Sequence, residues 1–307
     1  MKSVVVTGAT SMIGTALINE CIRNKVKVFA VVRPNSANIQ RLPESDYVTV
    51  IECDINDIQT LPQRTDIRAD VFYNIAWGFT GTRRNDSLEN QASNIQMTLN
   101  AVKAASALGC KKFVGAGSQA EYGLLDIDKI APDSPADPIT PYGIAKYAAG
   151  KLAMIACRRL GMDCLWPRIF SVYGIYDKPG SMISTTLSKV LKHEPAEFTA
   201  GIQRWDYLFS EDAGRAYYLI GEKACGYKVY CVGSGHSAPL REYIEIMLSA
   251  AGSDTEPQFG KIPYKSDTVM NLCADISSLT SDTGFVPRIG FEEGIRKTID
   301  WYYKEHK

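Results

Sequence analysis

The fold is decided by the stretch Val4-Val5-Val6-Thr7-Gly8-Ala9-Thr10-Ser11-Met12-Ile13-Gly14, near the start of a 307-residue chain. A β-branched run gives way to small residues, and apolar residues at helical spacing then follow, from Leu17 to Ile22. This pattern predicts a buried strand, a tight turn and the N-terminus of a helix, which together cradle a dinucleotide pyrophosphate. Units of this kind also occur with no nucleotide attached, so the stretch alone leaves both interpretations open.

Composition excludes several classes of partner. Lysine plus arginine and aspartate plus glutamate both number 34, so no global field attracts nucleic acid or an anionic membrane. The apolar start spans only Val4 to Val6, and charges interrupt every later apolar run, so we expect a cytoplasmic protein without a signal peptide. Eight cysteines without a Cys-x-x-Cys pair indicate reduced thiols and no metal site. With only three histidines, acid–base chemistry must come from another residue type.

Apolar β-rich runs alternate with helical patterns through the first half of the chain. This alternation predicts a Rossmann-type, doubly wound parallel α/β sheet. The expected strands are 3–7, 26–32, 47–52, 70–76, 111–116 and 163–170, and the expected helices are 12–24, 86–108 and 141–160.

The rhythm loosens after Phe170, where glycine and proline break the chain more often. We therefore expect a dinucleotide-binding domain over 1–170, to which 206–232 returns. Segments 171–205 and 233–290 are expected to form a smaller substrate lobe, and 291–307 a terminal helix.

A second motif lies at the start of the helix predicted over 141–160. Thr140 is a favourable N-cap and Pro141 suits the first helical position, so Tyr142 and Lys146 share one helical face. A neighbouring ammonium lowers the pKa of a tyrosine and suits it for acid–base work. The alternative is a packed tyrosine beside a lysine that extends to solvent. Ser118, at the end of an apolar strand, is either a third member of this set or a simple turn residue.

Together, Gly8, Gly14, Ser118, Tyr142 and Lys146 resemble the extended short-chain dehydrogenase/reductase family, in the branch that modifies nucleotide sugars. The resemblance implies that Ser118, Tyr142 and Lys146 are catalytic and that Lys146 also holds the nicotinamide ribose. In this chain, Ser11 stands where the family's glycine motif has its middle glycine. The cofactor contacts that it implies are Gly8, Thr10, Ser11, Met12, Ile13, Gly14, Asp54, Ile55, Ala76, Trp77, Asn94, Tyr142 and Lys146.

Arg33 bears on which cofactor is bound. NAD-binding members of the family carry an acidic residue at the end of the second strand, which accepts hydrogen bonds from the ribose 2′-hydroxyl. An arginine there suits a 2′-phosphate, so NADP(H) is preferred and NAD is possible. The alternative is a solvated surface arginine.

The resemblance also implies a substrate site made by Trp77, Ser118, Gln119, Ser171 and Arg204. Ser171 replaces the family's asparagine. Arg204 would grip the nucleotide diphosphate, or it could be an ion-pair partner of Asp206. Related 4,6-dehydratases carry an Asp-Glu pair directly after the hydroxyl residue, where this chain has Gln119 and Ala120. Dehydration is therefore not expected.

The leading hypothesis is an NADPH-dependent reductase of a nucleotide-linked 4-keto-(6-deoxy)sugar, in which hydride goes to C4 and Tyr142 donates the proton. The alternative is a nucleotide-sugar 4-epimerase with bound NAD, and a third is a non-catalytic NADP-binding protein. Family members often dimerise through a bundle that includes the Tyr142 helix, so we expect a homodimer.

Overall fold

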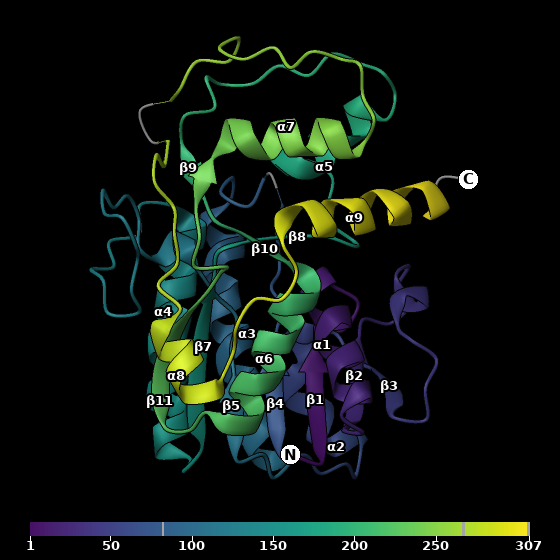
Figure 1. The fold of residues 1–307 in the computed structure, drawn as a ribbon. Helices are drawn as coiled ribbons and strands as arrows, with labels where there is room; N and C mark the ends of the chain where they lie inside the picture. The colour runs from purple at the N-terminus through teal and green to yellow at the C-terminus, as the bar shows by residue number, and fades with distance from the viewer. Residues whose placement is uncertain (82, 266–267, 306–307) are drawn as a thin grey trace.

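The computed structural model describes residues 1–81, 83–265 and 268–305, and Figure 1 shows how they are arranged. Residues 266–267, inside the predicted lobe segment 233–290, and residues 306–307, at the end of the predicted terminal helix, lie outside the described residues.

The main domain is built on a parallel sheet with strand order β11-β7-β5-β4-β1-β2-β3, and β6 pairs with β7. The order reverses between β1 and β4, and ligands of such sheets bind in the crevice at this reversal. The predicted fold class is confirmed, and the elements expected in the first half begin and end within two residues of the observed ones. The strands are β1 Ser3–Thr7, β2 Lys27–Val32, β3 Val48–Glu52, β4 Val71–Asn74, β5 Lys112–Val114, β6 Gly117–Ser118, β7 Asp163–Ile169 and β11 Tyr227–Val232.

Helices cover both faces of this sheet (Figure 1). Strand alternation sends Val4 and Val6 into one apolar core and Val5 into the other. The first core is shared with α1 (Met12–Arg23) and α6 (Ser210–Lys223), and the second with α3 (Leu88–Ala107) and α4 (Pro141–Arg159). Each fully buried valine contributes about 1.5–3 kcal/mol of transfer free energy, so both faces of the β1 strand stabilise the sheet.

The lobe lies beyond the carboxyl ends of the strands, at the top of Figure 1. Its core joins α5 (Met182–Val190), α7 (Leu240–Ala250) and α9 (Phe291–Glu305). Two small sheets connect it to the main domain. They consist of β8 Ser171–Tyr173 parallel to β10 Tyr207–Phe209, and β9 Arg204–Trp205 antiparallel to β12 Ala238–Pro239.

Of the predicted return over 206–232, α6 packs on the main sheet and β11 is one of its strands, whereas β10 belongs to a separate two-stranded sheet. Part of the range expected in the lobe also packs on the main domain. Leu279, in α8 (Ser277–Thr283), and Phe285 are buried in the core that β1 shares with α6. The short helices are η1 Ile39–Arg41, η2 Ile55–Thr60, α2 Leu61–Arg64 and η3 Gln119–Glu121.

All eight cysteines are free thiols, and seven of them are buried. Within the described ranges, no helix combines the length and the apolar character needed to cross a membrane.

Candidate active site

The turn after β1 is closed by two glycines that no other residue could replace without a shift. Gly8 has a φ of 67°, and a Cβ there would lie 2.8 Å from the Ala76 nitrogen. A Cβ on Gly14 would lie 2.2 Å from the Gly8 carbonyl oxygen. Ser11 between them has a φ of −79° and a ψ of 163°, which any residue adopts, and its hydroxyl accepts from the Gly14 N–H at 3.1 Å. The serine therefore preserves the turn and caps α1.

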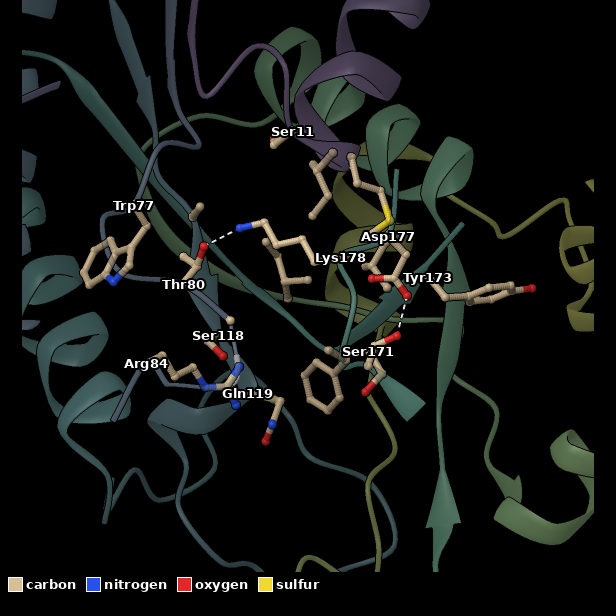
Figure 2. A pocket seen from close by; sticks show the side chains of 18 of the residues that line it. Ser11, Trp77, Thr80, Arg84, Ser118, Gln119, Ser171, Tyr173, Asp177 and Lys178 are labelled. Atoms are coloured by element: carbon tan, nitrogen blue, oxygen red, sulfur yellow. Dashed lines mark hydrogen bonds between the residues drawn. The ribbon is translucent and has the colours of Figure 1, made fainter. Parts of the chain in front are cut away.

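A cavity of about 700 Å³ opens between this turn, the ends of the strands and the lobe. Figure 2 shows that side chains from the main domain and from the lobe both reach it. The sequence-predicted residues that line it are Ser11, Met12, Ile13, Trp77, Ser118, Gln119, Tyr142, Lys146 and Ser171. Those that do not line it are Gly8, Thr10, Gly14, Arg33, Asp54, Ile55, Ala76, Asn94 and Arg204.

The three predicted catalytic residues meet in this cavity. Thr140 caps α4 by accepting from the Gly143 N–H at 3.1 Å, which places Tyr142 and Lys146 on the first turns of the helix. A Cβ on Gly143 would lie 2.3 Å from the Ala120 carbonyl oxygen, so the helix start packs tightly on the segment after Ser118. Ser118 and Tyr142 line the same cavity, and the Ser118 hydroxyl lowers the pKa of Tyr142, which favours the phenolate.

The Lys146 Nζ lies 5.7 Å from the centre of the Tyr142 ring, and its nearer partners are a backbone carbonyl and the ring of Trp77. This Nζ donates to the Ala116 carbonyl at 2.6 Å and lies 3.6 Å from the centre of the Trp77 ring. Burial lowers the pKa of Lys146 to about 7. Burial also raises the pKa of Tyr142, and the charge that opposes this rise is that of Arg84. The sequence analysis did not single out Arg84.

Ser118 is held from behind by a buried acid that sequence reasoning also missed. One oxygen of Glu121 accepts from the Ser118 N–H at 2.8 Å and from the Trp166 indole at 3.0 Å. The other oxygen accepts from Arg168 Nε at 2.7 Å. The Trp166 ring packs where a Cβ on Gly115, Gly117 or Gly150 would clash. Core packing therefore fixes the position of Ser118.

The loop after β4 is organised by two buried amides of α3. Asn94 accepts from the Gly78 N–H at 2.7 Å and donates to the Gly78 carbonyl at 3.2 Å. Gln91 accepts from the Trp77 indole at 3.0 Å. Asn94, predicted as a cofactor contact, thus holds the loop that carries Trp77 along the cavity wall.

Two other predicted cofactor residues lie at strand ends outside the cavity. Asp54 caps η2 by accepting from the Asn56 N–H at 2.9 Å. Arg33 is exposed at the end of β2, and its charge, like that of Arg41, lowers the pKa of Lys178 below what burial alone would give. Arg33 therefore belongs to a group of cations near the cavity.

The two predicted substrate residues at the lobe differ in placement. Ser171 lines the cavity, and its hydroxyl accepts from the Trp205 indole at 2.7 Å. Arg204 is exposed and donates to the Ser237 carbonyl. Strand alternation explains the difference, because Trp205 and Tyr207 face the cavity and Arg204 therefore points away from it. Asp206 instead accepts from backbone N–H groups of Ser234, Gly235 and Ala274.

Cations dominate the cavity wall. Arg41, Arg84, Lys146 and Lys178 line it, and among its described lining residues Asp177 supplies the one carboxylate. Arg41 donates to the Thr10 carbonyl beside the α1 turn at 3.4 Å. This charge balance suits ligands that carry several phosphates.

Comparisons with known proteins agree with this geometry. The sequence model of the NAD dependent epimerase/dehydratase family matches residues 4–233. The CDP-abequose synthase of Salmonella muenchen is 25% identical over 97% of this chain and 97% of its own length. The UDP-glucose 4-epimerase of Mycolicibacterium smegmatis is also 25% identical, with 97% of each chain covered.

Among solved structures, MoeE5 in complex with UDP-glucose and NAD is 25% identical, with a TM-score of 0.86 over 99% of this chain and 100% of that one. The family match covers the glycine turn, the Ser118–Tyr142–Lys146 set and the strands that position them. The chain belongs to the NAD dependent epimerase/dehydratase family.

Proposed function

We propose that the protein is an NADPH-dependent reductase of a nucleotide-linked 4-keto-(6-deoxy)sugar. The observation that carries the proposal is one cavity lined both by the α1 turn, at Ser11, and by Ser118, Tyr142 and Lys146. A dinucleotide fits the turn, because the backbone at Gly8 and Gly14 is free of side chains and the N-terminus of α1 favours phosphate. When bound, the nicotinamide supplies a hydride to C4 of the sugar.

The chain's own residues handle the oxygen of the ketone. As hydride reaches C4, the carbonyl π electrons move to oxygen, and Tyr142 gives that oxygen its phenolic proton. The product is a C4 alcohol, and a phenolate stays on the enzyme. The Ser118 hydroxyl, hydrogen-bonded to Tyr142, donates to the same oxygen and stabilises the phenolate afterwards. Lys146, directed at Ala116 and Trp77, is expected to hold the nicotinamide ribose.

The preference for NADPH rests on charge at the end of β2. Arg33 stands where an acid would bind the ribose of NAD, and the charges of Arg33 and Arg41 act together on Lys178. A guanidinium fork suits a 2′-phosphate. The substrate is expected to be a nucleotide sugar, whose diphosphate would meet the remaining cations of the cavity wall.

A 4-epimerase with bound NAD is the second candidate function. The epimerase from Mycolicibacterium smegmatis matches as well as the CDP-abequose synthase does, and MoeE5 binds UDP-glucose and NAD. The dehydratase reaction is disfavoured because Gln119, which lines the cavity, cannot shuttle a proton. A purely binding role is disfavoured because Tyr142 and Lys146 are both present in the cavity.

A homodimer through α4 is part of the proposal. Ile144, Leu152 and Ile155 recur at helical spacing on its surface and are 51%, 40% and 48% exposed. Burial of such a stripe against a second copy would remove its apolar area from water.

The deciding experiment supplies NADPH and a panel of nucleotide 4-keto-6-deoxyhexoses. We expect stoichiometric oxidation of NADPH with at least one of them. Protein that is purified with tightly bound NAD, and that interconverts 4-hydroxy nucleotide sugars without consuming a ketone, would instead be an epimerase.

A further inference from the structure

Arg84 lies beside the proposed proton donor. It belongs to the loop between β4 and α3, and its guanidinium carbon is 4.7 Å from the centre of the Tyr142 ring. It lines the cavity together with Ser118, and Figure 2 shows both side chains on the same side of it. A guanidinium at this distance favours the phenolate form of the tyrosine over the phenol.

The loop that carries Arg84 is fixed by contacts that do not involve its guanidinium. Gln91, which is 1% exposed, donates to the Arg84 carbonyl at 2.7 Å and to the Phe79 carbonyl at 3.0 Å. The side chain of Asn85 accepts from the Tyr142 N–H at 3.3 Å, which ties the loop to the start of α4. Changing the Arg84 side chain should therefore leave the loop in place.

Lys146 is a weaker source of charge at Tyr142. Its Nζ lies 5.7 Å from the Tyr142 ring centre, donates to Ala116 and has a pKa of about 7 because it is buried. A lysine with that pKa is charged only part of the time at neutral pH. An arginine stays protonated in proteins.

The other groups that act on Tyr142 do not supply a cation. Glu121 opposes the phenolate, although its carboxylate is paired with Arg168 at 2.7 Å. Ser118 contributes an uncharged hydroxyl that lowers the pKa of Tyr142. Burial, and to a lesser degree the charge of Tyr142, raises the pKa of Tyr217, a second buried phenol that supplies no positive charge.

We infer that Arg84 is a positioning residue, whose guanidinium supplies the permanent positive charge that stabilises the phenolate of Tyr142. Arg84 would thereby favour release of the Tyr142 proton to the substrate. The inference rests on the proposed function only for the use of that proton.

The test measures the titration of Tyr142 directly. Tyrosine labelled with ¹³C at Cζ reports phenolate formation by NMR, and the Tyr142→Phe variant assigns the signal. In Arg84→Gln we expect the Tyr142 midpoint to rise by about one pH unit or more, the effect of an opposite charge within about 4–6 Å. Tyr142 of Arg84→Gln could still be protonated at the highest pH at which the protein stays folded. If Tyr142 of the unmodified chain has begun to titrate at that same pH, this result supports the inference equally.

Two further variants complete the design. Arg84→Lys keeps a charge and should restore most of the shift. Arg83→Gln is the matched control, because Arg83 is exposed as Arg84 is, but it pairs with Asp86 at 2.8 Å and does not line the cavity, so its loss should leave the midpoint unchanged.

Equal midpoints in Arg84→Gln and the unmodified chain would overturn the inference, and so would equal shifts in Arg84→Gln and Arg83→Gln. The readout does not depend on turnover. If the midpoint shifts but no ketosugar is reduced, the proposed function fails and the role of Arg84 stands.

Discussion

Replacing Lys146 by methionine should make the protein inactive and, at neutral pH, more stable, and the gain in stability should shrink as the pH rises. Lys146 is 3% exposed, and burial lowers its pKa from 10.5 to about 7. Between these values the unfolded chain binds a proton that the folded chain does not. The stability of the unmodified protein therefore rises with pH through this window, and the penalty for burying the lysine is largest below it.

The two pKa values set the size of the effect. Each pKa unit corresponds to about 1.4 kcal/mol, so the penalty is about 4 kcal/mol at pH 7 and about 2 kcal/mol at pH 9. Methionine has a similar length and no charge, and it escapes this penalty. It also leaves the Ala116 carbonyl without its 2.6 Å donor, which costs about 1–3 kcal/mol at every pH. The slope with pH, rather than the absolute gain, is thus the signature.

Urea unfolding of both proteins at pH 6, 7, 8 and 9 measures that slope. The difference in unfolding free energy, Lys146→Met minus unmodified, should fall by about 2 kcal/mol from pH 7 to pH 9. Lys151→Met serves as the control, because Lys151 is exposed on the same helix, and its difference should stay flat. If the difference for Lys146→Met is also independent of pH, the lowered pKa of Lys146 in the folded protein is refuted.

Two further predictions concern the cofactor and the proton donor. Arg33→Ala should weaken NADPH binding about tenfold to a hundredfold, the value of a charge-assisted contact of roughly 1.5–3 kcal/mol, and should change NADH binding little. Equal losses for both cofactors, measured by calorimetric titration, would remove the 2′-phosphate role. Tyr142→Phe keeps the ring and loses the proton, so turnover should collapse while NADPH affinity survives; a variant that retained most of its turnover would show that another group is the acid.

The main domain could be predicted because its signals are local and periodic. The run from Val4 to Val6 is buried on both sides of a strand, and the spacing of Tyr142 and Lys146 is fixed by one helix. The role of Ser11 in the turn after β1 could be predicted only in part. The sequence showed only that Ser11 replaces the middle glycine of the motif, whereas its extended backbone and its bond to Gly14 show a normal helix cap.

The rest of the site depends on contacts between segments that the sequence does not link. Arg84 reaches Tyr142 because Gln91, a residue of α3, binds the loop backbone, and Glu121 is held by the indole of Trp166 on β7. No spacing in the chain announces these two contacts, although Ser118 and Glu121 stand at the i, i+3 spacing of a capping box, a signal that could have identified Glu121.

The placement of Arg204 depends on its position in the strand, because a shift of one residue would move it to the opposite face. A strand places neighbours on opposite faces, so the segment that brings Trp205 to the cavity necessarily turns Arg204 toward the Ser237 carbonyl. The sequence motif located this segment, but it could not tell which of its faces would line the cavity. Arg41 and Lys178, from two separate loops, line the cavity instead. A diphosphate bound there would meet charges that come from both sides of the crevice, which couples ligand binding to the placement of the lobe on the main domain.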